Sequence, residues 1–127
     1  MMVTSAVVEA VRAEARATHP QECCGLLYGS AVAITAHQSA ANIHACPETH
    51  FEIDPQALID AHRAMRNGGP HVVGYYHSHP TGPPEPSATD IAMAAEDGMI
   101  WVIVAAGEVR LWRAGASGFS ALSYTTI

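Results

Sequence analysis

The sequence contains no lysine, and its six basic residues are all arginine. Twelve acidic residues outnumber them, so the chain carries a formal net charge of −6 when histidine is neutral. Proteins that bind the phosphate backbone of DNA or RNA present a cluster or stripe of basic side chains, and this composition favours no such surface. We therefore expect no nucleic-acid partner.

Long apolar runs are also missing from the sequence. No stretch approaches the roughly 20 apolar residues that a membrane-spanning helix needs. The beginning of the chain is interrupted by charges at Glu9, Arg12, Glu14 and Arg16, which is not typical of a secretory signal peptide. These features predict a cytoplasmic protein without a membrane partner.

Cysteine is scarce and is not spaced for a structural role. The three cysteines, Cys23, Cys24 and Cys46, are odd in number, and two of them are adjacent, which argues against a disulfide framework. No Cys-x-x-Cys pair is present, which argues against a structural zinc site and against a nucleotide deaminase. We expect three reduced thiols, as in most cytosolic proteins, and no catalytic role for them.

The remaining composition suits one globular domain. Of the 127 residues, 49% are hydrophobic and 14% are charged, enough for a single hydrophobic core over residues 1–127. Apolar periodicity and turn residues predict helices over 4–17, 55–67 and 87–97, a loop over 38–48, and strands over 23–28, 32–36, 51–53, 71–77, 99–105, 108–114 and 119–124. This order predicts an α/β protein with a mixed β-sheet flanked by helices.

The most informative stretch begins at His77 and has the pattern His-x-His-Pro, six residues, then Ser-x-x-Asp. Two histidines separated by one residue on an extended chain project to the same face, so His77 and His79 can reach one metal ion. Asp90, in the first turn of the following helix, can complete the set. Two nitrogens and one carboxylate leave a tetrahedral zinc with a position open for water, as in catalytic sites. Helix capping is a competing role for Asp90.

Hydrolysis of an amide also needs a group that takes a proton from water and passes it to the leaving amine. Glu22 is the candidate because it precedes an apolar strand, where a buried carboxylate is costly unless it has a purpose. Ser87 is close enough to Asp90 in sequence to donate to the oxyanion that forms on attack. It is also an ordinary helix N-cap residue, and the sequence leaves both roles open.

These residues resemble the motif of the JAMM (MPN+) zinc metalloprotease family. The similarity includes Glu22, the Cys24–Gly29 run and the pattern that begins at His77, while Asn42 and the Phe51–Pro55 run resemble the small stand-alone bacterial members. The resemblance implies a cytidine-deaminase-like α/β/α sandwich. It also implies one zinc ion per chain.

For individual residues, the resemblance implies three metal ligands and two catalytic groups. His77, His79 and Asp90 would hold the zinc, Glu22 would act as general acid and base on zinc-bound water, and Ser87 would help to bind the oxyanion. For function, it implies a metallopeptidase or isopeptidase that cuts an amide bond at the C-terminal Gly-Gly tail of a ubiquitin-like or sulfur carrier protein. Glycine suits such a substrate, because only an extended tail without side chains enters a narrow groove.

Two alternatives remain within the same resemblance. A DNA-repair-associated protein of the RadC type has a similar histidine and aspartate pattern, but the acidic balance argues against it. A non-catalytic MPN-type scaffold would have lost the ligands, which are present here. Among the other residues, we expect Tyr75, Trp101 and Trp112 in the core and Tyr76 at the cleft, and no ligand role for the other six histidines.

Overall fold

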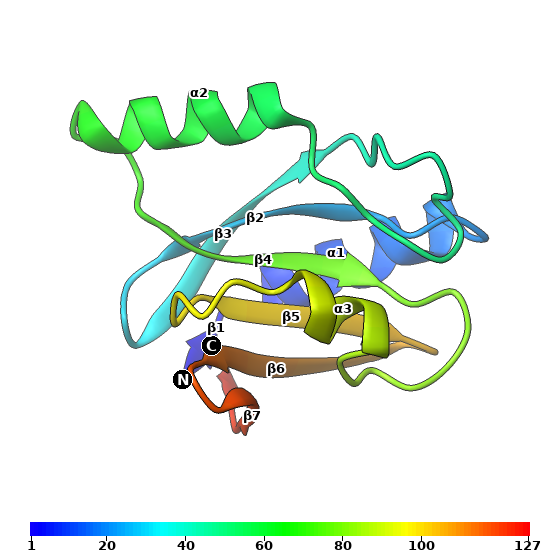
Figure 1. Ribbon diagram of the computed structural model, residues 1–127. Helices are drawn as coiled ribbons and strands as arrows, with labels where there is room; N and C mark the ends of the chain where they lie inside the picture. Colours follow the sequence, from blue (N-terminus) through cyan, green and yellow to red (C-terminus); the bar gives the residue numbers. More distant parts are fainter.

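The computed structural model describes residues 1–127 and contains a curved, eight-stranded mixed sheet with helices on both faces (Figure 1). The elements are β1 (Met2–Val3), α1 (Ser5–Thr18), β2 (Cys24–Gly29), β3 (Ala33–Ala40), α2 (Pro55–Arg66), β4 (Val72–Ser78), α3 (Ala88–Met93), β5 (Ile100–Ala105), β6 (Glu108–Gly115), β7 (Gly118–Leu122) and β8 (Thr125–Thr126). The strand order is β7-β6-β5-β4-β2-β3-β1-β8. Because β4 is parallel to β5 and antiparallel to β2, the mixed sheet is confirmed.

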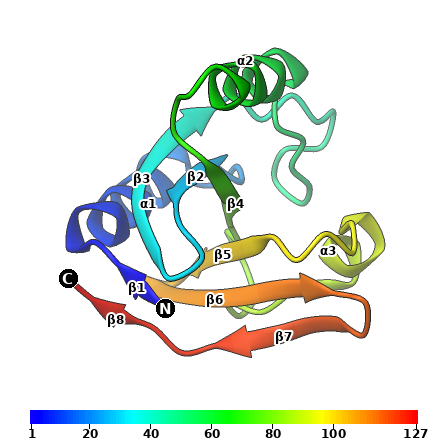
Figure 2. The same cartoon turned by 90° about the vertical axis from the view of Figure 1, so that its left-hand side faces the viewer.

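Helix α1 covers one face of the sheet and forms the main core with it (Figure 2). The helix begins where the Thr4 side chain accepts a hydrogen bond from the Val7 backbone, as an N-cap does. Its apolar stripe buries Val7, Val8 and Val11. These side chains belong to the same cluster as Leu27 on β2 and as residues of β4, β5 and β6.

Helix α2 covers the opposite face with a smaller core. Asp54 caps the helix by accepting from the Gln56 backbone at 3.0 Å, and Pro55 occupies the first helical position, where its missing N–H costs nothing. The buried Ala61 packs against Leu26 and Val72. Of the three helices, none combines the length and hydropathy needed to span a bilayer.

Strand β4 lies at the centre of the sheet and distributes its side chains between the two faces. Tyr76 points to the α1 side, where it is 0% exposed and donates a hydrogen bond from its hydroxyl to Glu14 Oε2 at 2.7 Å. Tyr75 points to the other side, is half-buried and lines a cavity there. The expectation that Tyr76 lies at the cleft was therefore wrong, whereas Tyr75 packs against the smaller core, as expected, and also lines this cavity. Alternation along the strand places Tyr75, and not Tyr76, on the side of His77.

Several other element boundaries differ from the sequence prediction. Strand β3 continues to Ala40, through residues expected to form a loop, because it pairs with β2 as far as Cys24↔Ala40. Ile53 forms an isolated bridge with Asn42 rather than a strand. Helix α3 ends at Met93, four residues before the predicted end, since the backbone at Ala94 is extended.

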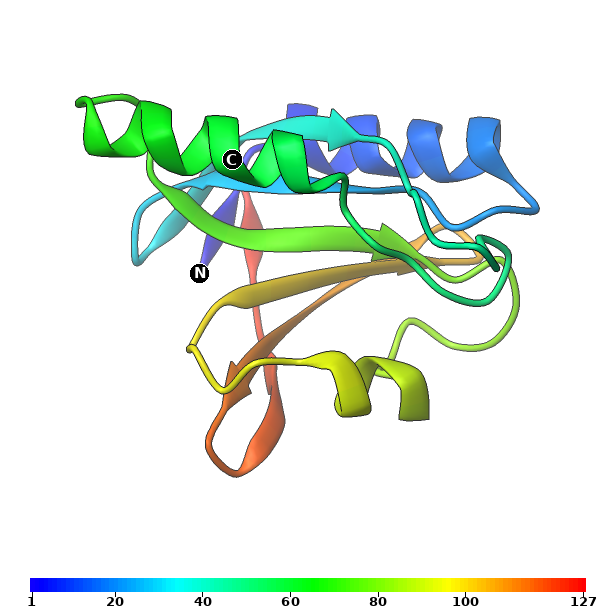
Figure 3. The ribbon, with the colours of Figure 1, turned by 45° about the horizontal axis from the view of Figure 1, so that its top comes forward.

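The aromatic core prediction is confirmed only in part. Trp101 is buried on β5, whereas Trp112 on β6 is half-buried and donates from its indole nitrogen to the Pro84 carbonyl at 3.1 Å. The segment between β3 and α2 lies beside the end of β4 (Figure 3), where Phe51 stacks on His77. The end of β4 is therefore a place where the strand meets a segment that is distant from it in sequence.

Candidate active site

The structure brings His77, His79 and Asp90 together at the end of β4. His77 is fully buried near the end of the strand, His79 follows the strand directly, and Asp90 lies in the first turn of α3. The Nε2 atoms of the two histidines are 3.1 Å apart, and each lies 3.0–3.1 Å from a carboxylate oxygen of Asp90. The three side chains form one group of potential ligand atoms within 4.8 Å of one another.

The hydrogen bonds around this group suit a cation. Nδ1 of His79 donates to the Pro83 carbonyl at 2.8 Å, which places the ring proton there and leaves the Nε2 lone pair facing Asp90. Lone pairs of nitrogen and oxygen at this spacing repel unless a proton or a metal ion lies between them. Two imidazoles and one carboxylate are a donor set that zinc accepts, so the residues present fit a metal ion.

The electrostatics favour the metal-binding forms of two of the three side chains, the Asp90 carboxylate and the neutral ring of His77, whereas a proton competes with a metal ion at His79. Burial opposes the charged form of Asp90, but the ring nitrogens of His77 and His79 beside it outweigh this and hold the pKa of the carboxyl well below its usual range. Burial lowers the pKa of His77, so its ring is neutral at physiological pH. Burial also opposes a charge on His79, but the Asp90 carboxylate and the Pro83 carbonyl favour the protonated form of its ring and raise its pKa.

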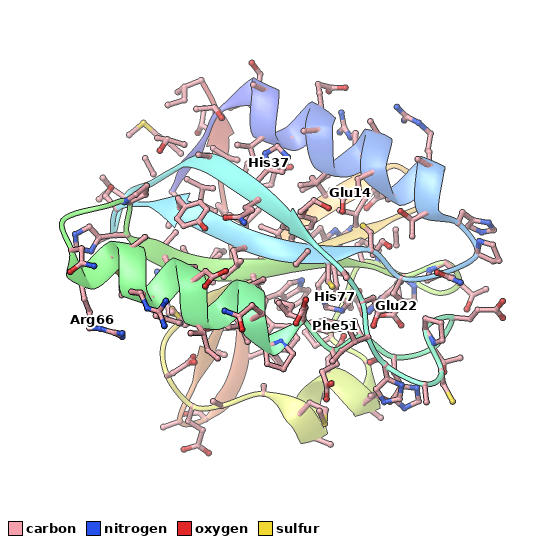
Figure 4. All side chains as sticks on the ribbon, turned by 90° about the horizontal axis from the view of Figure 1, so that it is seen from above. Glu14, Glu22, His37, Phe51, Arg66 and His77 are labelled. Atoms are coloured by element: carbon pink, nitrogen blue, oxygen red, sulfur yellow. The ribbon has the colours of Figure 1, made fainter.

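Aromatic side chains hold the ring of His77 in place. Phe51 stacks on it with ring centroids 4.3 Å apart (Figure 4). Trp101 meets it edge-on, with ring centroids 5.5 Å apart. Nδ1 of His77 is buried and has no hydrogen-bond partner, so packing alone supports the Nδ1 edge of this ring, while Nε2 faces Asp90 at 3.1 Å. No local sequence pattern predicts these contacts, because Phe51 and Trp101 lie 26 and 24 residues away from His77 along the chain.

Glu22 lies just before β2, at the same end of the sheet as His77 (Figure 4), and its carboxyl group is near His79 and Asp90. It is 5% exposed, and its Oε1 has no hydrogen-bond partner. Burial raises the pKa of Glu22 to about 7, an effect that nearby His79 opposes and Asp90 reinforces. A carboxyl group with such a pKa can both accept and return a proton near neutral pH.

Asn42 positions the backbone near Glu22, a role that its resemblance to the small bacterial family members does not reveal. Its amide nitrogen donates at 3.0 Å to the backbone carbonyls of Glu22 and of His50. Its amide oxygen accepts from the backbone of His44 and of Glu52. Asn42 therefore ties the segment between β3 and α2 to the backbone of Glu22.

Ser87 and Asp90 form a reciprocal capping box at the start of α3. The Ser87 hydroxyl accepts from the Asp90 backbone at 3.0 Å, and the Ser87 backbone donates to Asp90 Oδ2 at 2.9 Å. The capping role of Asp90 is therefore present together with its place beside the histidines. The hydroxyl hydrogen of Ser87 remains free to donate, because a serine oxygen can accept one bond and donate another.

Three cavities border this group, and the one with a volume of about 720 Å³ is lined by Arg12, Arg16 and His79, among others. The other two differ in their lining. A polar cavity of about 260 Å³ is lined by Glu22, Glu48, Thr49, His79, Ser87 and Thr89, among others. An apolar cavity of about 220 Å³ lies on the other side of Asp90, and its walls include Leu58, Tyr75, Met93 and Trp101. His44 and His50, which stack 4.5 Å apart, also line the apolar cavity but do not belong to the ligand group.

The fold and the site together define a class of protein. It is an α/β protein in which a mixed sheet brings two histidines and a carboxylate together near the end of its central strand, as a potential metal site. Residues 4–115 match the family described as prokaryotic homologs of the JAB domain, and the chain belongs to this family. The expected resemblance to the JAMM/MPN proteins is thereby confirmed.

Known relatives have related folds and sequences. The chain is 38% identical to a desampylase of Haloferax volcanii over 66% of this chain and 62% of the relative, so the match spans about three fifths of that protein. It is 31% identical to the CysO-cysteine peptidase of Mycobacterium tuberculosis over 82% of this chain and 72% of the relative. A JAB1/MPN domain protein from Archaeoglobus fulgidus has the same fold, with a TM-score of 0.65 at 17% identity over 100% of this chain and 96% of that one.

The three cysteines are free thiols in the structure. Cys23 and Cys24 are both buried, and Cys46 is exposed. Burial raises the pKa of Cys23 to about 11 and that of Cys24 to about 12. At neutral pH both are therefore protonated and unreactive, because the thiolate is the nucleophile.

We expect iodoacetamide at pH 7.5 to modify Cys46 alone in the native protein and all three cysteines after denaturation. Mass spectrometry of the intact chain measures the number of adducts. Hydrolytic activity should survive the single modification. More than one adduct on the native protein, or loss of activity while the metal stays bound, would contradict the burial and the non-catalytic role of these thiols.

Proposed function

We propose that this protein is a zinc-dependent metallopeptidase or isopeptidase that hydrolyses an amide bond at the C-terminal Gly-Gly tail of a ubiquitin-like or sulfur carrier protein. The observation that carries this proposal is the convergence of His77, His79 and Asp90 beside the buried carboxyl group of Glu22. The names of two relatives, a desampylase and a CysO-cysteine peptidase, support a substrate of this kind. We further propose a cytoplasmic location, which the three free thiols favour.

His77, His79 and Asp90 would hold the zinc ion, which when bound supplies Lewis-acid polarisation of the scissile carbonyl and makes water more acidic. The Pro83 carbonyl keeps His79 in the required tautomer, and the Ser87 backbone keeps the Asp90 carboxylate in place. These supporting bonds come from a short loop and a helix cap.

Glu22 would move the proton. Its carboxylate accepts a proton from the attacking water and delivers it to the leaving nitrogen as the C–N bond breaks. Burial suits both halves of this cycle, because it raises the pKa to about 7 and so brings the charged and neutral forms close in free energy. Ser87 would donate its hydroxyl hydrogen to the oxyanion on the former carbonyl.

The two alternatives are less well supported. A non-catalytic scaffold has no need for a carboxyl group that is 5% exposed and lacks a hydrogen-bond partner beside the ligand group, because such burial costs stability. A DNA-associated role requires a basic surface, whereas the chain has twelve acidic residues and six basic ones.

We expect the purified protein to contain about one zinc ion per chain, and His79→Ala to lose most of it, because two ligands rarely retain zinc. His71→Ala removes an exposed histidine outside the ligand group and is the matched control. Elemental analysis after gel filtration measures the metal content. Full zinc in His79→Ala would show that the ligand assignment is wrong.

We expect Glu22→Gln to keep its zinc and its fold but to lose activity by about 10²-fold or more, because an amide of the same shape cannot carry the proton. Ser87→Ala should lose less activity than Glu22→Gln and also about 1 kcal/mol of stability, since it removes the helix cap. Glu96→Gln, at an exposed carboxyl group away from the ligand group, is the control for lost charge. Turnover near that of the wild type in Glu22→Gln would remove Glu22 from the mechanism.

A further inference from the structure

Ser78 lies between the two histidines of the ligand group, and the mechanism gives it no part. By alternation along β4, its side chain is on the opposite face of the strand from the His77 ring, the face that α1 covers. It is 3% exposed, and a buried hydroxyl group normally has a hydrogen-bond partner. Here its oxygen accepts from the Cys23 N–H at 2.9 Å. Ser78 therefore joins the strand of the ligands to the residue that follows Glu22.

The backbone geometry explains why a side chain makes this bond. Cys23 and Ser78 lie one residue beyond the last pair of the ladder that joins β2 and β4. The Ser78 N–H donates to the Cys23 carbonyl at 3.1 Å, and in a regular antiparallel pair the Cys23 N–H would donate to the Ser78 carbonyl in return. The Ser78 hydroxyl takes the place of that second acceptor at the point where the chain leaves the ladder toward His79.

The Cys23 N–H belongs to the peptide group that joins Glu22 to Cys23. The carbonyl of the same peptide group accepts from the Asn42 side chain at 3.0 Å, and the Glu22 N–H donates to the Pro47 carbonyl at 2.7 Å. Hydrogen bonds therefore hold the backbone on both sides of the Glu22 Cα. Two of them come from the segment between β3 and α2, whereas the bond from Ser78 comes from the strand that carries the ligands.

The position of this backbone decides where the Glu22 carboxyl group lies. Oε1 of Glu22 is buried without a hydrogen-bond partner, so its place depends on the Cα from which the side chain extends and on the packing around it. A proton passes efficiently only between heavy atoms about 3 Å apart, and a displacement of about 1 Å can cost roughly 10²-fold in rate. A residue that fixes the Glu22 backbone against the ligands therefore has a direct influence on turnover.

We propose that Ser78 is a positioning residue for Glu22. Its hydroxyl holds the peptide group after Glu22 against β4, and so sets the place of the proton-carrying group relative to His77 and His79. Ser78 itself neither touches the substrate nor carries a proton, and its effect on the reaction passes through Glu22. This inference rests on the proposed function.

The first test measures hydrolysis of a short extension from a sulfur carrier protein that ends in Gly-Gly. We expect Ser78→Ala to keep its zinc and to lose about tenfold or more in kcat, with KM changed by less than about twofold, because the substrate contacts are untouched. Ser39→Ala is the matched control, since it removes a hydroxyl that bonds to Glu14 at 2.8 Å on the α1 side, and it should keep its kcat.

Two further variants separate the hydrogen bond from the shape of the side chain. Ser78→Thr keeps the hydroxyl, and its added methyl group has room because Ser78 lines the cavity of about 720 Å³, so its kcat should be near that of the wild type. Ser78→Cys fills the space with a weak acceptor and should lose activity as Ser78→Ala does. Wild-type kcat in both Ser78→Ala and Ser78→Cys would overturn this inference alone.

A double-mutant cycle shows whether Ser78 acts through Glu22. When Ser78→Ala is added to Glu22→Gln, we expect the residual kcat to fall by less than about twofold, because the group that Ser78 positions no longer carries a proton. A loss of equal size in both backgrounds, or a loss of zinc in Ser78→Ala, would assign Ser78 to general support of the fold or of the ligands and overturn the proposal.

Hydrogen exchange gives a readout that does not depend on activity. In the metal-free protein, NMR should find the Cys23 amide protected in the wild type and in Ser78→Thr, and exchanging about tenfold faster or more in Ser78→Ala. Equal protection in Ser78→Ala and the wild type would contradict the bond on which the inference depends. A wild type that hydrolyses no carrier extension or conjugate would overturn the proposed function, and this inference with it.

Discussion

The alternation of side chains along β4 is the constraint on which the rest of the site depends. The strand is paired on both edges, with Cys24 and Ile103 opposite His77, so its residues cannot change faces without breaking two ladders. Tyr76 closes the core beneath α1, and His77 on the other face is fully buried against Phe51. Stability and ligand position therefore come from the same backbone pairing.

The second fixed point is the start of α3. The hydrogen bonds that begin this helix, between Ser87 and Asp90, also hold the Asp90 carboxylate toward the histidines. Two hydrogen bonds hold His79, which lies in the segment between β4 and α3. Its backbone N–H donates to the Val104 carbonyl, and its ring donates to the Pro83 carbonyl. A ligand group supported in this way loses little conformational freedom when a metal ion binds.

Sequence reasoning could place the residues whose positions are set locally. The spacing after His77 and the cap before Asp90 are local patterns, and the structure brings those side chains together. Contacts between distant segments were not predictable, because no local pattern fixes them. Examples are the stacking of Phe51 on His77, the hydrogen bond from the Asn42 side chain to the Glu22 backbone, and the continuation of β3 along β2. The position of Tyr76 could have been predicted, since the alternation that places His77 and His79 on one face places Tyr76 on the other.

The most direct test of the proposed function compares the same Gly-Gly tail on a folded carrier protein and as a free peptide. A tail of about six residues costs roughly 1–2 kcal/mol per residue in backbone entropy when it is ordered. Strand addition beside the site would recover part of this cost, and contact with a folded carrier must supply the rest. We expect kcat/KM for a short extension on the folded carrier to exceed that for the free tail peptide by at least about 10²-fold, which corresponds to about 2.7 kcal/mol. Equal efficiency on both would identify a general peptidase and contradict a carrier-specific function.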